Sequence, residues 1–223
     1  PPEGDGRYLC AGRYIALAQE LEMPVNHLTT ILNQRHGRPH RYWRIGTVLH
    51  PEGEFRDIWP EMRDGKFVAI GWDRLGDLSG RYEDGRALTE GVKQLLETHY
   101  PSTPGVITRK ANEIRRFVNL DSSPAHLSVG DLVLPSNGMK VLAIGHVTGD
   151  YQFVEGSPCP HRRPVDWLDL SEWKMSHQDG LRTTVWELSK YAVNLVEAER
   201  HILAKPSTPP LPPKLEGIAG RIP

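Results

Sequence analysis

Cysteine is scarce in this sequence, and long apolar runs are missing. The 223 residues include only Cys10 and Cys159, with no Cys-x-x-Cys pair, which excludes a disulfide framework and argues against a structural zinc site. No apolar run approaches the roughly 20 residues of a membrane span, and the first residues lack the apolar centre of a signal peptide. We therefore expect a cytoplasmic protein that has no membrane partner.

The sequence also lacks a strong charge of either sign. Its formal net charge is −1, so any nucleic-acid binding must come from a local basic patch rather than a global field. The patch that the sequence offers is Arg109, Lys110, Arg115, Arg116, His161, Arg162 and Arg163. These side chains either contact phosphates or form a solvated helix face and loop, and the two interpretations are equally favoured.

Common catalytic motifs are absent as well. There is no GxxxxGK[ST] phosphate loop, no GxSxG elbow and no HExxH helix. The carboxylates Asp166, Asp169 and Glu172, with Lys174, resemble a magnesium-dependent nuclease cluster, but alternate residues of a strand point to opposite faces and need not converge. We therefore expect a binding module rather than an enzyme, with no metal and no cofactor.

The chain divides into three parts. Residues 1–41 form a helical segment, for which a degenerate helix-turn-helix is an alternative interpretation, with apolar residues at helical spacing on both sides of Pro24. Residues 42–203 form the main domain. Residues 204–223 are rich in proline and are predicted to be an extended linker to a further C-terminal domain.

The main domain mixes short strands and helices, which predicts an α+β fold, namely a small twisted β-barrel flanked by helices. Apolar alternation and turn signals predict strands at 42–49, 67–70, 132–135, 141–147, 162–168 and 183–188, with an extended piece at 151–154. Helical spacing predicts helices at 55–62, 84–100, 108–120 and 189–203.

The stretch from Lys66 to Leu78 holds the most unusual tryptophan. Phe67–Ile70 is predicted to be a buried strand that delivers Trp72 into a polar turn, directly before Asp73. Most aromatic side chains belong to the core. A tryptophan at a strand exit beside a carboxylate can instead line a pocket with a stacking face and a hydrogen-bond acceptor.

Several short motifs occur in an order that resembles one family of modified-base readers. They are Tyr42-Trp43-Arg44-Ile45, Ile70-Gly71-Trp72-Asp73, Gly130-Asp131-Leu132-Val133, Arg163-Pro164-Val165-Asp166-Trp167-Leu168 and Thr183-Thr184-Val185-Trp186-Glu187-Leu188. They resemble the EVE and YTH branch of the PUA-like superfamily, particularly the N-terminal specificity domains of McrB-type modification-dependent restriction proteins. The resemblance covers about 42–203, and the tail Pro212–Ile218 resembles the segment that leads into the motor of those proteins.

The resemblance implies a reader of double-stranded DNA that flips a methylated base into an aromatic cage. It also implies an AAA+ GTPase domain and a McrC-type nuclease subunit as partners. The residues that it places around the base are Trp72, Asp73, Tyr151, Phe153, Trp43, Ser136 and Asn137. Either Tyr151 or Phe153 is the wall opposite Trp72, and Trp43 is as well explained by the core. A PUA-like RNA-binding module is the alternative function.

Overall fold

The computed structural model describes residue 22 and residues 41–49, 55–120, 122–123 and 125–204. The predicted N-terminal helical segment lies almost entirely outside these residues, and so does the predicted linker beyond Ala204. Within the described residues, no helix combines the length and the apolar character needed to cross a membrane.

A nine-stranded mixed β-sheet occupies the centre of the molecule. Its main order is β11-β1-β5-β7-β9-β4, where β1 and β5 run parallel and the other pairs are antiparallel. β6 pairs with both β5 and β10, β8 pairs with β9, and the separate ribbon of β2 (Val48–Leu49) and β3 (Arg56–Asp57) lies outside the sheet. The strands of the sheet are β1 Tyr42–Gly46, β4 Phe67–Ile70, β5 Leu132–Asn137, β6 Lys140–Val141, β7 Ile144–Val147, β8 Gln152–Phe153, β9 His161–Asp169, β10 Trp173–Lys174 and β11 Val185–Glu187.

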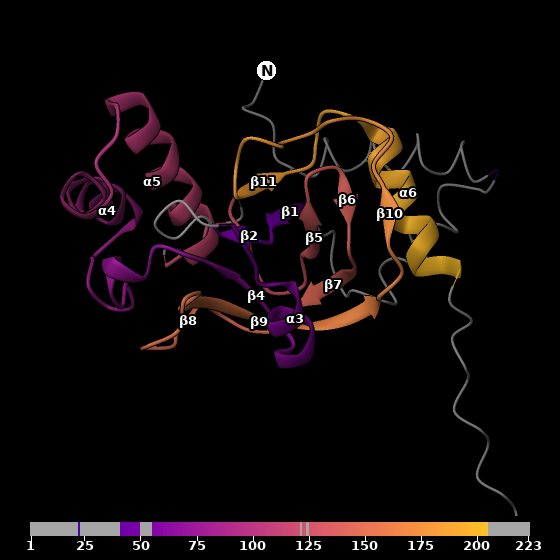
Figure 1. The fold of residues 1–223 in the computed structure, drawn as a ribbon, viewed down its shortest axis with the longest axis horizontal. Coiled ribbons are helices and arrows are strands. Elements are labelled where there is room, and N and C mark those ends of the chain that lie inside the picture. The colour runs from indigo at the N-terminus through magenta and orange to yellow at the C-terminus, as the bar shows by residue number, and fades with distance from the viewer. Residues whose placement is uncertain (1–21, 23–40, 50–54, 121, 124, 205–223) are drawn as a thin grey trace, which may run out of the picture.

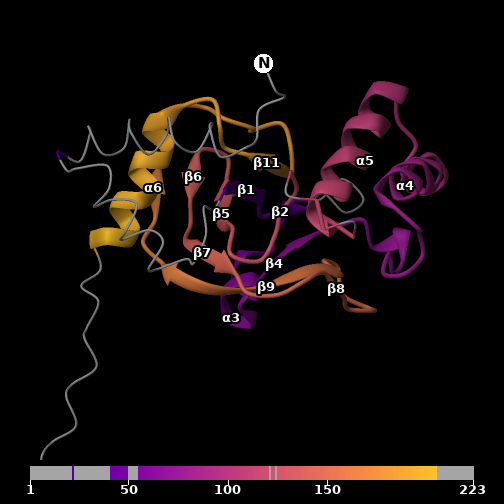
Figure 2. The ribbon, with the colours of Figure 1, turned by 180° about the vertical axis from the view of Figure 1, so that it is seen from behind.

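The longer helices lie at the two ends of this sheet, whereas the short helix α3 lies beside β4. Figures 1 and 2 show α4 and α5 together at one end and α6 at the other. The helices are α3 Trp59–Gly65, α4 Gly85–His99, α5 Pro104–Val118 and α6 Ala192–Ala204, and a 3₁₀ turn, η2, spans Asp73–Leu75.

Local sequence explains where the two long helices lie. The Asp84 side chain accepts hydrogen bonds from the backbone N–H groups of the first turn of α4, which would otherwise lack partners. Leu88, Val92 and Leu96 then recur on one buried face of the helix. α5 begins at Pro104, a residue that suits the first helical position, and ends at Asn119 in the left-handed conformation.

Two hydrophobic cores lie on opposite faces of the sheet. Along β1, Trp43 and Ile45 belong to the core under α3, α4 and α5, whereas Tyr42 belongs to the core under α6. β5 alternates in the same way, with Val133 in the first core and Leu132 and Leu134 in the second. This period of two means that both central strands are covered on both faces.

The α+β class predicted from the sequence is confirmed. The predicted small twisted β-barrel is not confirmed. Among the described strands the sheet stays open, because β4 pairs only with β9 and β11 pairs only with β1. The strand predicted at 141–147 is divided between β6 and β7, and β10 was not predicted.

Candidate functional site

Trp72 leaves the sheet in a strained backbone conformation. β4 is buried throughout, and one residue after Gly71 the backbone of Trp72 adopts the left-handed conformation, with φ 65° and ψ 45°. This region costs a residue with a side chain roughly 1–2 kcal/mol. The Trp72 carbonyl is held from two sides, by the N–H of Leu75 at 3.0 Å and by Nε2 of His161 at 3.2 Å.

His161 connects Trp72 to Tyr151 through a partly buried hydrogen-bond chain. A carbonyl only accepts, so Nε2 of His161 carries the hydrogen and Nδ1 accepts from the Tyr151 hydroxyl at 2.8 Å. The same hydroxyl accepts from the N–H of Leu78 at 3.4 Å. Burial lowers the pKa of His161, and burial also raises the pKa of Tyr151, so both groups stay neutral in this chain.

Trp72 lines an open pocket of about 270 Å³, which we call the Trp72 pocket. Its walls come from β2, the exit of β4, the end of α4, α5 and the segments before β9 and β11. Its lining residues are Val48, Leu49, Gly71, Trp72, Asp73, Tyr100, Lys110, Pro158 and Thr184. The lining therefore includes two aromatic residues, one aspartate and one lysine.

Tyr100 and Asp73 form the polar part of this pocket. The Tyr100 hydroxyl donates to Oδ1 of Asp73 at 2.7 Å and accepts from the N–H of Arg74 at 3.0 Å. Burial, followed by the hydrogen bond to Asp73, raises the pKa of Tyr100 to about 12, so the hydroxyl remains a donor at neutral pH. Asp73 is exposed and its carboxylate is fixed in position, which makes it an acceptor for a ligand's N–H group.

The two residues predicted as the second wall, Tyr151 and Phe153, gather around His161 instead. Their ring centroids lie 5.8 Å and 5.5 Å from the His161 ring, and neither residue lines the Trp72 pocket. Tyr100 supplies the second aromatic ring. In the sequence, Tyr100 is only the last residue of the helix predicted at 84–100, and no local pattern marks it as a pocket residue, because the packing of α4 on η2 places it there.

Trp43 is a core residue in this structure. Its side chain is fully buried, and its Nε1 donates to Oδ2 of Asp131 at 3.0 Å. Asp131 also accepts from the N–H groups of Arg41 and Ser128. The Asp131 carboxylate thus ties Trp43, on β1, to the turn before β5.

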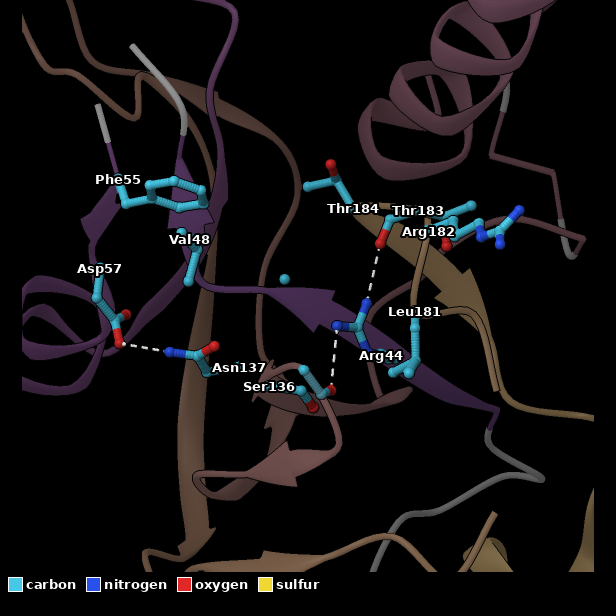
Figure 3. A pocket seen from close by; sticks show the side chains of 12 residues that line it. Arg44, Val48, Phe55, Asp57, Ser136, Asn137, Leu181, Arg182, Thr183 and Thr184 are labelled. Carbon is cyan, nitrogen blue, oxygen red and sulfur yellow. Dashed lines mark hydrogen bonds between the residues drawn. The ribbon is translucent and has the colours of Figure 1, made fainter. Parts of the chain in front are cut away.

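Ser136 and Asn137 line a second pocket, of about 580 Å³, which we call the Arg44 pocket (Figure 3). Asn137 donates to Oδ2 of Asp57 at 3.3 Å, and the Ser136 hydroxyl donates to the Leu134 carbonyl. Val48 and Thr184 line this pocket and the Trp72 pocket alike, so the two hollows adjoin.

The predicted phosphate contacts fall into two groups. His161 and Arg163 are buried, and Arg163 donates to the carbonyls of Phe117 and Val118 at the end of α5, at 2.7 Å and 2.8 Å. Arg162 is half-buried over the Phe67 ring. Arg109 is exposed, and the half-buried residues on α5 are Lys110, Arg115 and Arg116.

The carboxylates considered for a nuclease do not converge. Asp166 lies 4.0 Å from His146, Asp169 lies 3.0 Å from His201, and Glu172 pairs with Lys140. Across the described residues, no group of three or more His, Cys, Asp or Glu side chains is arranged to hold a metal ion.

A family model for a domain of unknown function, DUF8426, matches residues 48–189. The chain belongs to this family. No curated protein and no solved structure matches it. Every residue that lines the Trp72 pocket lies within the DUF8426 domain, from Val48 to Thr184.

Proposed function

We propose that the DUF8426 domain of this chain is a noncatalytic reader of DNA that takes one flipped, methylated base into the Trp72 pocket. The carrying observation is the strand-exit Trp72, held in a left-handed conformation at an open pocket that also contains Tyr100, Asp73 and Lys110. Strained backbone is kept where the surrounding structure enforces it, and such positions cluster at binding sites.

The size and chemistry of the pocket support a single planar group as its ligand. A volume of about 270 Å³ lies just below the roughly 300–1,000 Å³ of pockets that hold larger small molecules. The Trp72 and Tyr100 rings offer apolar faces, while Asp73 offers an oxygen acceptor at the edge. A nucleobase combines a flat π face with a polar edge and matches both parts.

The cost of extruding a base and the gain from binding it in such a pocket are of similar size. Extruding a base costs a few kcal/mol of unstacking and unpairing. Stacking on aromatic side chains returns about 1–3 kcal/mol per base, and a buried methyl group adds about 0.8 kcal/mol. The discrimination between a methylated and an unmethylated base therefore depends on how closely the pocket surrounds the methyl group.

The carboxylate of Asp73 favours bases that carry an exocyclic amino group. The amino groups of adenine and cytosine donate hydrogen bonds, whereas the corresponding position of thymine is a carbonyl oxygen. A carboxylate facing a carbonyl would leave two acceptors opposed. We therefore assign methyladenine or methylcytosine as the ligand, rather than a thymine derivative.

The resemblance to EVE- and YTH-like domains supports a wider context for this reader. In that context the curved, mixed sheet is a variant of the small PUA-like barrel. The reader then directs an AAA+ GTPase domain and a McrC-type nuclease subunit to modified DNA. Lys110 and Arg109 on α5 would contact phosphates beside the pocket, because Lys110 lines it and Arg109 is exposed one residue earlier.

Binding of the 223-residue chain to a panel of duplexes tests the proposal. Each duplex carries one methyladenine, one methylcytosine or no modification, and affinity is measured by fluorescence anisotropy at fixed salt. We expect a preference for one modified duplex. Trp72→Ala should weaken that binding about 5- to 150-fold, which corresponds to the 1–3 kcal/mol of one stacking contact. Trp72→Phe, which keeps an aromatic face, should retain part of it.

Thermal unfolding of each variant shows that a loss of binding does not come from a loss of structure. Equal affinity of the wild-type chain for all duplexes overturns the proposal, and so does an unchanged preference in Trp72→Ala. A preference for a modified single-stranded RNA over the modified duplex would instead assign the pocket to RNA.

A further inference from the structure

The Arg44 pocket is larger than the Trp72 pocket and adjoins it. The proposed function places the flipped base in the Trp72 pocket and leaves the Arg44 pocket without a ligand. It holds about 580 Å³, and Val48 and Thr184 form its boundary with the Trp72 pocket. Figure 3 shows Phe55 and Arg182 on opposite sides of this hollow. A ligand seated at Trp72 would therefore extend toward it along the surface of the same domain.

Arg44 places a buried positive charge in the wall of this pocket. Its side chain is only 3% exposed, and its guanidinium donates to the carbonyls of Gly180, Thr183 and Gly138. Its Nε is buried and has no hydrogen-bond partner among the described residues. These carbonyls are neutral, and the charge of the buried Glu113 carboxylate partly compensates that of the guanidinium.

Charge and apolar surface are both present at the rim. Arg182 is exposed, and no hydrogen bond or ion pair of its side chain is found within the described part of the chain. Phe55 is 79% exposed, which is unusual for a phenylalanine. Asp57, the carboxylate that lines this pocket, accepts a hydrogen bond from Asn137, and the exposed Arg182 is the cation at the rim.

We propose that the Arg44 pocket binds the nucleotide next to the flipped base, with the phosphate at Arg182 and the neighbouring base against Phe55. Flipping removes one stacking partner from each neighbouring base and leaves a bare π face in the duplex. An exposed aromatic side chain covers such a face, as apolar wedges do in other bent or opened duplexes. This inference rests on the proposed function and extends it to the sequence context of the modified base.

The test uses the modified duplex that the wild-type chain prefers, together with two versions in which either the 5′ or the 3′ neighbour of the modified base is abasic. Phe55→Ala should weaken binding to the intact duplex about tenfold. That loss should disappear on one of the two abasic duplexes, because the base that Phe55 covers is missing there. Leu170→Ala, a second exposed apolar residue, is the matched control and should change nothing.

Arg182→Gln tests the phosphate contact. It should reduce the slope of log Kobs against log salt concentration by about 0.9 for a duplex, the contribution of one phosphate. Arg86→Gln, which removes an exposed arginine from α4, is the control and should leave the slope unchanged.

The outcomes separate this inference from the function on which it rests. If Trp72→Ala abolishes the preference for the modified duplex while Phe55→Ala binds like the wild type, the nucleotide site at the Arg44 pocket is overturned alone. If Phe55→Ala lowers the affinity equally for all three duplexes, the nucleotide site at the Arg44 pocket is overturned as well. If Trp72→Ala has no effect, the base pocket itself is overturned.

Discussion

Replacing Trp43 by phenylalanine tests whether this tryptophan serves the core rather than base binding. The substitution keeps an aromatic ring but removes Nε1, which donates to Oδ2 of the buried Asp131 at 3.0 Å. A hydrogen bond to a charged group contributes about 1.5–3 kcal/mol. The smaller ring also leaves a cavity, for which we add about 1 kcal/mol, the order of a small buried deletion. We expect Trp43→Phe to lower the free energy of unfolding by about 2.5–4 kcal/mol.

Urea unfolding followed by circular dichroism measures this loss. Trp167→Phe is the matched control, because its Nε1 donates at 3.0 Å to a neutral carbonyl, that of Arg63, and the side chain is only half-buried. Trp167→Phe should lower the free energy of unfolding by only about 0.5–1.5 kcal/mol. Folded Trp43→Phe should keep the wild-type preference for modified DNA. Wild-type stability within about 0.5 kcal/mol, combined with a lost preference, would refute the core assignment and return Trp43 to the cage.

Two further predictions concern the groups that position the pocket. Burial lowers the pKa of His161, so the unfolded chain takes up a proton near pH 6.5 while the folded chain does so only at lower pH, and stability falls as the pH drops between the two pKa values. Urea unfolding at pH 7.5 and 5.5 should therefore show a smaller loss in His161→Leu than in the wild type, and an equal loss would contradict the buried neutral imidazole. Tyr100→Phe should weaken modified-DNA binding about 2- to 10-fold by releasing Asp73. Because the pKa of Tyr100 is raised to about 12, its contribution to stability is complete below pH 10 and is lost as pH rises toward 12. An absorbance titration of tyrosinate should accordingly lose one late ionisation in Tyr100→Phe.

Local patterns predicted most elements of the fold well. Phe67–Ile70 is a strand with the predicted bounds, because four apolar residues stand between Lys66 and Gly71. α4 matches its prediction within one residue at each end, since Asp84 caps it and Pro101 follows its last turn. α5 begins four residues before the predicted start, because the fixed backbone of Pro104 suits the first helical position.

Long-range pairing was less accessible to sequence reasoning. β10 has two residues, Trp173 and Lys174, and exists as a strand only because β6 lies beside it. Barrel closure likewise depends on whether β4 meets a second strand, which no pattern within 67–70 specifies. Such contacts join segments far apart in the chain, and their geometry depends on the packing of the whole domain.

The candidate site shows the same division. Trp72 and Asp73 could be predicted as pocket residues, because a strand exit and its neighbouring carboxylate are visible in consecutive residues. Tyr100 and Thr184 could not, because they reach the pocket from α4 and from the segment before β11. Tertiary packing alone brings these residues to Trp72.

The basic run on β9 shows how strand periodicity changes an electrostatic interpretation. His161, Arg162 and Arg163 look like one patch in the sequence, but alternate residues of a strand face opposite sides, and both His161 and Arg163 are buried. Arg163 ties β9 to the end of α5. The cations that line the two adjoining pockets instead include Lys110 on α5 at the Trp72 pocket and Arg182 at the Arg44 pocket, and under the proposed function these are the side chains that a phosphate would meet.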